Sequence, residues 1–309
     1  MPSVPHALSG LSVGEPTTCR QLTVWPLLGD DATRERYFTL DEAVSQGWAA
    51  ITEVAPDGSI PEVQIVNDSP YQVLAIDGEE LAGARQDRVV NITVLVPHVA
   101  RVLLPVCGVE EGRWSYRGRA LRPTPRVQDA SGRARRFRQV SMSLREIGDR
   151  RAHQADVWGH VAALSSRLSS GSPTTALSAV FERHAAGIEE SVRAFGCVPT
   201  QRGACFEVEG GLRGLELFDR AATCARLLPK LVRGYAVDAL ARAGGASRPG
   251  WRSTAAVTGF LGDIAEARAE GFPAVGSGLD LRFEGPSLTG GALLAGDRVV
   301  HLVAFVGAP

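Results

Sequence analysis

The sequence predicts an α+β fold with an antiparallel, β-rich N-terminal half, a helical middle and C-terminal strands that return to a sheet. Between residues 48 and 106, apolar residues alternate with polar ones, which is typical of strands with one buried face. Helical spacing of apolar residues replaces this alternation from residue 158 to residue 240. Strand patterns return between residues 280 and 306, so these strands are expected to pair with a sheet formed earlier.

The elements follow one another with recognisable start and stop signals. Thr39 and Glu42 have the spacing of a capping box, which predicts a short helix to Gln46. Ser172 and Pro173 predict the start of a helix that runs through Phe195. Strands are expected at 22–27, 48–54, 63–66, 71–76, 88–96, 102–106, 204–208, 212–217, 280–284, 290–294 and 299–306. Further helices are expected over 158–168, 218–240 and 254–268.

The chain is expected to form a flexible N-terminus, residues 1–20, and one integrated α+β domain, residues 21–309. Within that domain, a β-rich part over 21–112 precedes a loop over 113–138 and a helical and strand part over 139–309. The loop is predicted because the segment is rich in Arg, Pro, Gly and Ser. Its arginines could contact a nucleic acid, but a solvated linker is the preferred interpretation.

The charge balance disfavours nucleic acids and membranes as partners. The 309 residues include 33 basic and 34 acidic side chains and carry a net charge of −1, so no global field attracts polyanions or anionic lipids. Lys230 is the only lysine, and its place among apolar residues at helical spacing predicts a surface lysine with a buried stem. Recognition of an anionic small molecule is therefore expected to depend on arginine.

Known cofactor motifs do not occur in the sequence. It has neither a P-loop nor a dinucleotide-binding fingerprint, and its five cysteines show no C-x-x-C spacing. The cofactor is unknown, a divalent metal stays open, and the oligomeric state is not predicted. Because the first twenty residues lack a secretory pattern, a reduced, cytoplasmic protein is expected.

Polar residues concentrate in the segment from Asp77 to Asn91, which we expect to form a loop between strands. Glu79 and Glu80 are candidates for general acid and base if their environments separate their pKa values. Gln86, Arg88 and Asn91 are candidate substrate-binding residues. The alternative is a polar turn with solvated glutamates.

A second candidate segment surrounds Glu110, Arg113 and Trp114. An arginine beside a tryptophan offers a planar cation for phosphate or carboxylate and an aromatic face for a base or sugar. The alternative is an edge-strand turn whose tryptophan fills the core.

The histidines provide three further candidates. His153, Asp156 and His160 lie at i, i+3 and i+7 and would share one surface of a helix that includes all three, a spacing that suits a metal, a proton shuttle or a helix-surface histidine pair. His184 lies in an apolar stripe and is interpreted as a core histidine. His301 faces away from its apolar neighbours, and so points either into a site or into solvent.

Taken together, these segments resemble a bacterial and archaeal domain of unknown function, named for its association with ADP-ribosylglycohydrolases and rhodanese-phosphatase proteins. The resemblance is carried by residues 37–43, 60–63, 77–81, 83–91, Glu110 and 112–114. Weaker matches are Gln154, 157–158, Gly214, 217–218, 235–236, 281–282 and 301–302. The chain departs from the family pattern at Gly108, where a cysteine is expected; Cys107 lies beside it, so a thiol-dependent mechanism is in doubt.

The resemblance implies a role near nucleotide, ADP-ribose or phosphate-ester metabolism. The first hypothesis is a hydrolase or lyase that acts on an anionic, nucleotide-like small molecule. Its catalytic residues would be Glu79, Glu80, Glu110 and His301, and its substrate-binding residues Gln86, Arg88, Asn91, Arg113, Trp114 and Arg282. The alternatives are a non-catalytic ligand sensor and a repurposed enzyme of specialised metabolism.

Overall fold

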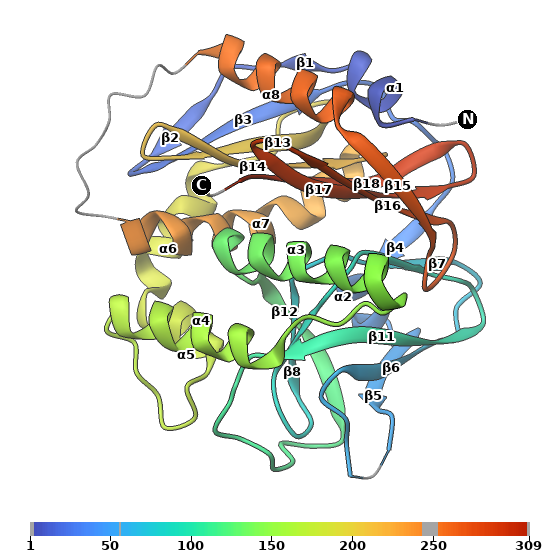
Figure 1. Cartoon of the computed structure of the whole chain (residues 1–309), viewed down its shortest axis with the longest axis vertical. Coiled ribbons are helices and arrows are strands. Elements are labelled where there is room, and N and C mark those ends of the chain that lie inside the picture. Colours follow the sequence, from blue (N-terminus) through green and yellow to red (C-terminus); the bar gives the residue numbers. More distant parts are fainter. Residues whose placement is uncertain (1–2, 56, 243–252, 308–309) are drawn as a thin grey trace. The chain divides into compact units, whose positions relative to one another are not determined.

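The computed structural model of the chain describes residues 3–55, 57–242 and 253–307, and these form two compact units. Unit 1 comprises the described parts of Met1–Arg34, Ala186–Pro273 and Gly278–Pro309. Unit 2 comprises the described parts of Glu35–Ala185 together with Ala274–Ser277. Both units combine helices and strands (Figure 1), which confirms the predicted α+β fold.

Unit 1 is built on an antiparallel sheet with the strand order β1-β3-β13-β14-β18-β17-β16-β15, and β2 pairs with β3. The C-terminal strands join β14 through β18, so the predicted return of these strands to an earlier sheet is confirmed. The strands are β1 (Ser12–Val13), β2 (Thr17–Cys19), β3 (Leu22–Leu28), β13 (Gln201–Val208), β14 (Gly211–Phe218), β15 (Arg268–Pro273), β16 (Leu279–Gly285), β17 (Leu288–Ala295) and β18 (Arg298–Val306).

Helices cover both faces of this sheet (Figure 1). On one face, Val257, Phe260 and Ile264 of α8 pack with Leu8 of α1 over buried strand residues, because these apolar positions recur at helical spacing. On the other face, Tyr235 of α7 stacks on Phe206 of β13 with a centroid distance of 3.8 Å. The helices are α1 (Val4–Ser9), α6 (Ala185–Ala194), α7 (Ala221–Arg242) and α8 (Thr254–Glu266).

Unit 2 is built on a closed barrel with the strand order β11-β6-β5-β12-β8-β9. A separate three-stranded sheet has the order β10-β7-β4, in which β4 and β7 run parallel. The barrel strands are β5 (Ala49–Glu53), β6 (Glu62–Asn67), β8 (Glu79–Gly83), β9 (Arg88–Val90), β11 (Ala100–Gly108) and β12 (Ala120–Val127). The other strands are β4 (Tyr37–Thr39), β7 (Gln72–Ala75) and β10 (Val94–Val96).

The helices of unit 2 are α2 (Leu40–Ser45), α3 (Ala130–Ile147), α4 (Gln154–Arg167) and α5 (Leu177–Arg183). The predicted capping box is present at the start of α2. The Glu42 amide donates to Thr39 Oγ1 at 3.4 Å, and the Thr39 amide donates to Glu42 Oε2 at 2.9 Å. Both amides would otherwise lack a partner within the helix, so the box fixes where α2 begins.

The structure differs from the sequence predictions in the segment expected to be a loop over 113–138. That segment contains β12 and the start of α3 instead. Asp129 caps α3 by accepting a hydrogen bond from the Gly132 amide at 2.8 Å. The prolines of β12 are tolerated because the pairing with β8 shifts register between Pro123 and Val127.

The expected flexible N-terminus also contains regular structure over its described residues. Ser3 caps α1, and Val4 and Leu8 are buried. The expected loop from Asp77 to Asn91 includes β8 and β9, which pair with each other. These short segments also contact residues that are distant in the sequence: α1 packs with α8, β8 pairs with β12, and β9 pairs with β11.

The expected continuous helix through Phe195 is interrupted. The first helix, α5, begins at Leu177 rather than near Pro173 and ends at Arg183. Its C-cap is His184, whose Nε2 lies 2.9 Å from the Leu168 carbonyl oxygen. Lys230 is buried rather than exposed, with 4% of its surface accessible. None of the helices in the described part of the chain combines the length and the apolar character that a membrane crossing requires.

Candidate functional site

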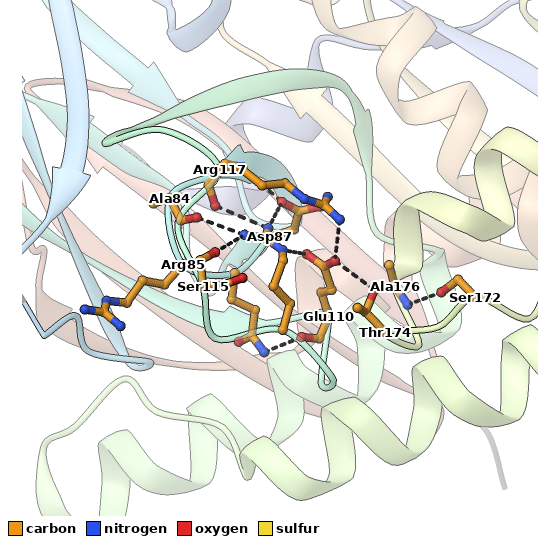
Figure 2. Close-up of polar contacts among 12 residues, drawn as sticks. Ala84, Arg85, Asp87, Glu110, Ser115, Arg117, Ser172, Thr174 and Ala176 are labelled. Carbon is orange, nitrogen blue, oxygen red and sulfur yellow. Dashed lines mark hydrogen bonds and ion pairs between the residues drawn. The ribbon is translucent and has the colours of Figure 1, made fainter.

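A network of buried ion pairs surrounds Glu110, between β11 and β12 of unit 2 (Figure 2). Arg113 Nε donates to Glu110 Oε2 at 2.6 Å, and Arg113 Nη2 donates to Asp87 Oδ1 at 2.8 Å. The second oxygen of Glu110 accepts from Thr174 Oγ1 at 2.8 Å and lies 3.3 Å from Arg117 Nη2. Because Glu110 is fully buried, these partners replace the water that its carboxylate loses.

Gln86 links this network to a second buried arginine. Its Nε2 donates to the main-chain oxygen of Glu110, and its Oε1 accepts from Arg88 Nη1 at 2.9 Å. The Arg88 guanidinium lies 3.6 Å from the Glu53 carboxylate and 5.3 Å from the centre of the Trp114 ring. Burial lowers the pKa of Arg88 and the nearby Glu53 carboxylate opposes this effect. The structure therefore brings together the predicted residues Gln86, Arg88, Glu110, Arg113 and Trp114.

Glu80, predicted as an acid or base, is fully buried on β8. Its Oε2 accepts from Thr124 Oγ1 at 2.7 Å and from Arg126 Nε at 2.5 Å, whereas its buried Oε1 has no hydrogen-bond partner. Burial raises the pKa of Glu80, and attraction to Arg126 opposes that shift without cancelling it. The neighbouring Glu79 is also fully buried and accepts from the Ile76 amide at 2.9 Å.

The environment of Gly108 explains why a cysteine does not fit at this position of the chain. A Cβ atom on Gly108 would lie 1.9 Å from Gln86 Oε1, so any side chain there requires Gln86 to move. The neighbouring thiol of Cys107 is buried, and burial raises its pKa. Asn91 donates to the Arg150 carbonyl oxygen at 3.0 Å, and Gln154 bonds both the amide and the carbonyl of Gly108.

Two predicted site residues, Arg282 and His301, belong to unit 1. Arg282 Nη2 donates to Asp280 at 2.9 Å. His301 lies 2.9 Å from Glu216 Oε2, is stacked on Phe218 and is 1% exposed. The side chain of His301 therefore points into the interior rather than into solvent.

A pocket of about 460 Å³ lies between α3 and α4. We call it the α3–α4 pocket. Its lining includes three arginines of α3, a glutamine that precedes the helix, and two titratable residues of α4: Arg135, Arg136, Arg138, Gln128, Asp156 and His160. None of these residues belongs to the site predicted from the sequence, although the sequence pattern did single out Asp156 and His160.

A separate buried ion-pair cluster, around Asp77, adjoins the α3–α4 pocket. Arg133 Nε donates to Asp77 Oδ2 at 3.1 Å, and Arg136 Nη2 donates to Asp77 Oδ1 at 2.5 Å. Another nitrogen of Arg136, Nη1, donates to Gln128 Oε1. Asp77 lies between β7 and β8, so these bonds hold α3 against the start of β8 and fix Arg136 at the pocket.

Next to Arg136, a histidine and a carboxylate form a close pair. His160 Nε2 lies 2.8 Å from Asp129 Oδ1 and 3.0 Å from Oδ2. Burial alone raises the pKa of Asp129, but attraction to His160, its hydrogen bond and that of the Gly132 amide together lower it below its usual value. The buried carboxylate is therefore ionised at neutral pH and orients the imidazole at the pocket.

The set His153, Asp156 and His160 does not form a metal site. His153 stands at the N-cap of α4, and Asp156 accepts from Gln139 Nε2 at 2.7 Å. Across residues 3–55, 57–242 and 253–307, no group of three or more His, Cys, Asp or Glu side chains is placed to hold a metal ion. The helical spacing singled out His160 but not its partner, because Asp129 lies in the segment expected to be a loop.

These features define an α+β protein in which an internal arginine–carboxylate network supports a basic pocket with a histidine–aspartate pair. A family model described as the ARG and Rhodanese-Phosphatase-superfamily-associated Protein domain, ARPP-1, matches residues 10–305. The chain belongs to this family, and the predicted resemblance is confirmed. Comparisons with curated proteins and with solved structures find no match.

The Arg113 contacts generate a stability prediction. Arg113→Met leaves the buried Glu110 and Asp87 carboxylates without their main counter-charge, so we expect the free energy of unfolding to fall by about 3–5 kcal/mol. Arg117→Met is the matched control: its guanidinium contacts the same Glu110 but is 59% exposed, so a loss of at most about 1 kcal/mol is expected. Urea denaturation measures the free energy of unfolding of both variants. Equal losses would show that the burial of Arg113 does not make its ion pairs more stabilising than the exposed contact of Arg117.

The raised pKa of Glu80 generates a prediction about pH. A carboxyl whose pKa is higher in the folded than in the unfolded protein destabilises the fold as pH rises from its usual 4.5 through the folded value. Glu80→Gln removes this ionisation, so its stability relative to wild type should increase as the pH rises from 4.5 through the raised pKa of Glu80. Glu182→Gln is the matched control, because Glu182 lies near the same Arg126 but is 73% exposed, where solvent screens the interaction. Denaturant titration at several pH values measures both, and a decreasing difference for Glu80→Gln would rule out the assignment.

Proposed function

We propose that this chain is a hydrolase or lyase that binds an anionic, nucleotide-like or phosphate-containing small molecule in the α3–α4 pocket. The observation that carries the proposal is the His160–Asp129 pair, at 2.8 Å, in a cavity that three arginines also line. A general base and a set of cations in one cavity are the minimum that hydrolysis of an anionic substrate requires.

The charge of the pocket favours an anion. Arg135 and Arg138 are exposed on α3, and Arg136 is buried at the pocket with two of its nitrogens already bonded. Arg136 therefore supplies fixed positive potential, and the two exposed guanidinium groups can reach a ligand. Their planar forks suit bidentate contacts to phosphate or carboxylate oxygens.

The histidine pair supplies the acid–base function in this proposal. Asp129 fixes the Nε2 side of the His160 ring and stabilises the imidazolium that forms when the ring accepts a proton. Proton transfer to and from the substrate or a water molecule is assigned to Nδ1. Asp129 is a positioning residue, because it contacts His160 and acts on the substrate only through that histidine.

The buried carboxylates have a supporting role in the proposal. Glu79, Glu80 and Glu110 are fully buried and bond to neighbouring protein groups, which suits positioning better than contact with a substrate. The family description associates the domain with the ARG and rhodanese-phosphatase groups, and we extend this association to a phosphate-containing substrate. The proposal includes a cytoplasmic location, which the free state of the cysteines supports.

The test is a panel of ADP-ribose, nucleoside monophosphates and nucleoside diphosphates, read by thermal shift and by product chromatography. We expect one member to raise the Tm of the wild-type protein and to be converted to product. His160→Gln should keep the Tm shift and lower kcat by about 10²–10⁴-fold, because the base is lost while the arginines remain.

His153→Gln is the matched control, since it changes an exposed histidine at the start of the same helix without a side-chain cap bond. It should leave kcat unchanged. A Tm shift without product in the wild type would favour the ligand sensor instead. If no member of the panel changes the Tm, both the hydrolase or lyase and the ligand sensor are contradicted.

A further inference from the structure

A second pocket, of about 380 Å³, lies in unit 1 at one edge of its sheet. We call it the edge pocket. β3 and β14 end at this edge, and β13 and β18 begin there, because neighbouring strands of the sheet run antiparallel. Its charged lining consists of two arginines and two aspartates, which lie beside a histidine of α1: Arg202, Arg298, Asp30, Asp297 and His6.

The two arginines of the edge pocket are buried and held in place. Arg202 of β13 is 7% exposed; its Nε donates to the Phe218 carbonyl oxygen at 3.0 Å, and its Nη1 donates to the Asp30 carbonyl oxygen at 2.9 Å. Arg298 of β18 is 6% exposed, and its Nε donates to Oδ2 of the fully buried Asp219 at 2.9 Å. The two guanidinium groups are therefore fixed cations on the inner side of the pocket.

The two aspartates give the outer side of the edge pocket the opposite charge. Asp30 follows β3, Asp297 lies in the turn between β17 and β18, and both residues are exposed. The aspartates repel a plain anion, and the arginines repel a plain cation. The lining therefore suits a small molecule that carries a negative and a positive group a few bonds apart.

We propose that the edge pocket binds a free α-amino acid. The carboxylate of the ligand accepts hydrogen bonds from Arg202 and Arg298, because a planar guanidinium fork matches two carboxylate oxygens. The ammonium group of the ligand faces Asp30 and Asp297. The volume of the pocket is at the lower end of the range for small-molecule sites, which suits a ligand of this size. All of these residues belong to unit 1, so the inference does not depend on the function proposed for the α3–α4 pocket of unit 2.

The test is isothermal titration calorimetry of the full-length protein with each of the twenty standard amino acids. The tightest binder is then compared with its N-acetyl analogue, which lacks the positive charge, and with its methyl ester, which lacks the negative charge. We expect one or more amino acids to bind saturably and both analogues to bind about tenfold more weakly, because each analogue loses a charge-assisted contact. Equally tight binding of the N-acetyl analogue would indicate a plain anion site and overturn the proposal. The absence of saturable binding by all twenty amino acids would overturn it as well.

Variants of the lining locate the binding. Arg202→Lys keeps the charge but loses the fork, so it should weaken amino-acid binding about tenfold. Asp297→Asn should weaken binding of the amino acid about 2–5-fold, since an exposed ion pair is lost, and should strengthen binding of the N-acetyl analogue, which the aspartate repels. Asp263→Asn is the matched control, because Asp263 is an exposed aspartate of α8 outside the lining, and it should leave both affinities unchanged.

The opposite effects of Asp297→Asn on the two ligands decide the question. If this variant changes both affinities in the same direction or changes neither, the ammonium group does not face the aspartates and the proposal is wrong. An equal loss of amino-acid binding in Asp263→Asn would also overturn it. Should Arg202→Lys fail to fold, Asp297→Asn and the two analogues test the proposal without it.

Discussion

The pairing of buried carboxylates with arginine side chains is the constraint on which unit 2 depends. Asp77, Glu80 and Glu110 are fully buried, and each contacts at least one guanidinium group. An unpaired buried charge costs several kcal/mol, so each segment can occupy its place only when its partner does. The pairs of Asp77 and Glu80 thus link β8 and the turn before it to α3 and β12, which follow later in the sequence.

Two glycines let this network reach the pocket. A Cβ on Gly78 would lie 2.6 Å from Arg133 Cδ, and Gly78 has a φ of +82°, so glycine suits both the close approach and the backbone there. A Cβ on Gly132 would lie 2.8 Å from His160 Nε2 and 2.6 Å from Gln128 Nε2. The absence of a side chain at position 132 therefore leaves room for the imidazole and the amide at the start of α3, where Asp129 contacts the imidazole.

Local signals in the sequence predicted local structure well. The capping box at Thr39, the hairpin of β13 and β14 and the alternating C-terminal strands were all predicted, because each depends on neighbouring residues. The prediction of a loop over 113–138 was wrong because the arginines of this segment resemble those of a solvated linker. Their burial depends on partners such as Asp77, which is 59 residues from Arg136.

At the site, too, burial and pairing depend on residues that are distant in the sequence. The resemblance selected Gln86, Arg88, Glu110 and Arg113, which do lie together, but residue type alone does not indicate burial, which is a property of the fold. His160 was singled out by helical spacing, whereas Asp129, 31 residues away, carried no local signal of pairing with it. The polar clusters in the sequence therefore predicted the residues of the buried network, but they did not predict the α3–α4 pocket.

The proposed binding of a phosphate-containing anion beside His160 in the α3–α4 pocket can be followed by nuclear magnetic resonance. Protein with isotope-labelled histidine is titrated with inorganic pyrophosphate. We expect saturable shifts of the His160 ring resonances, with those of the buried His301 and the exposed His6 unchanged. Saturable binding that leaves the His160 resonances unmoved would contradict it.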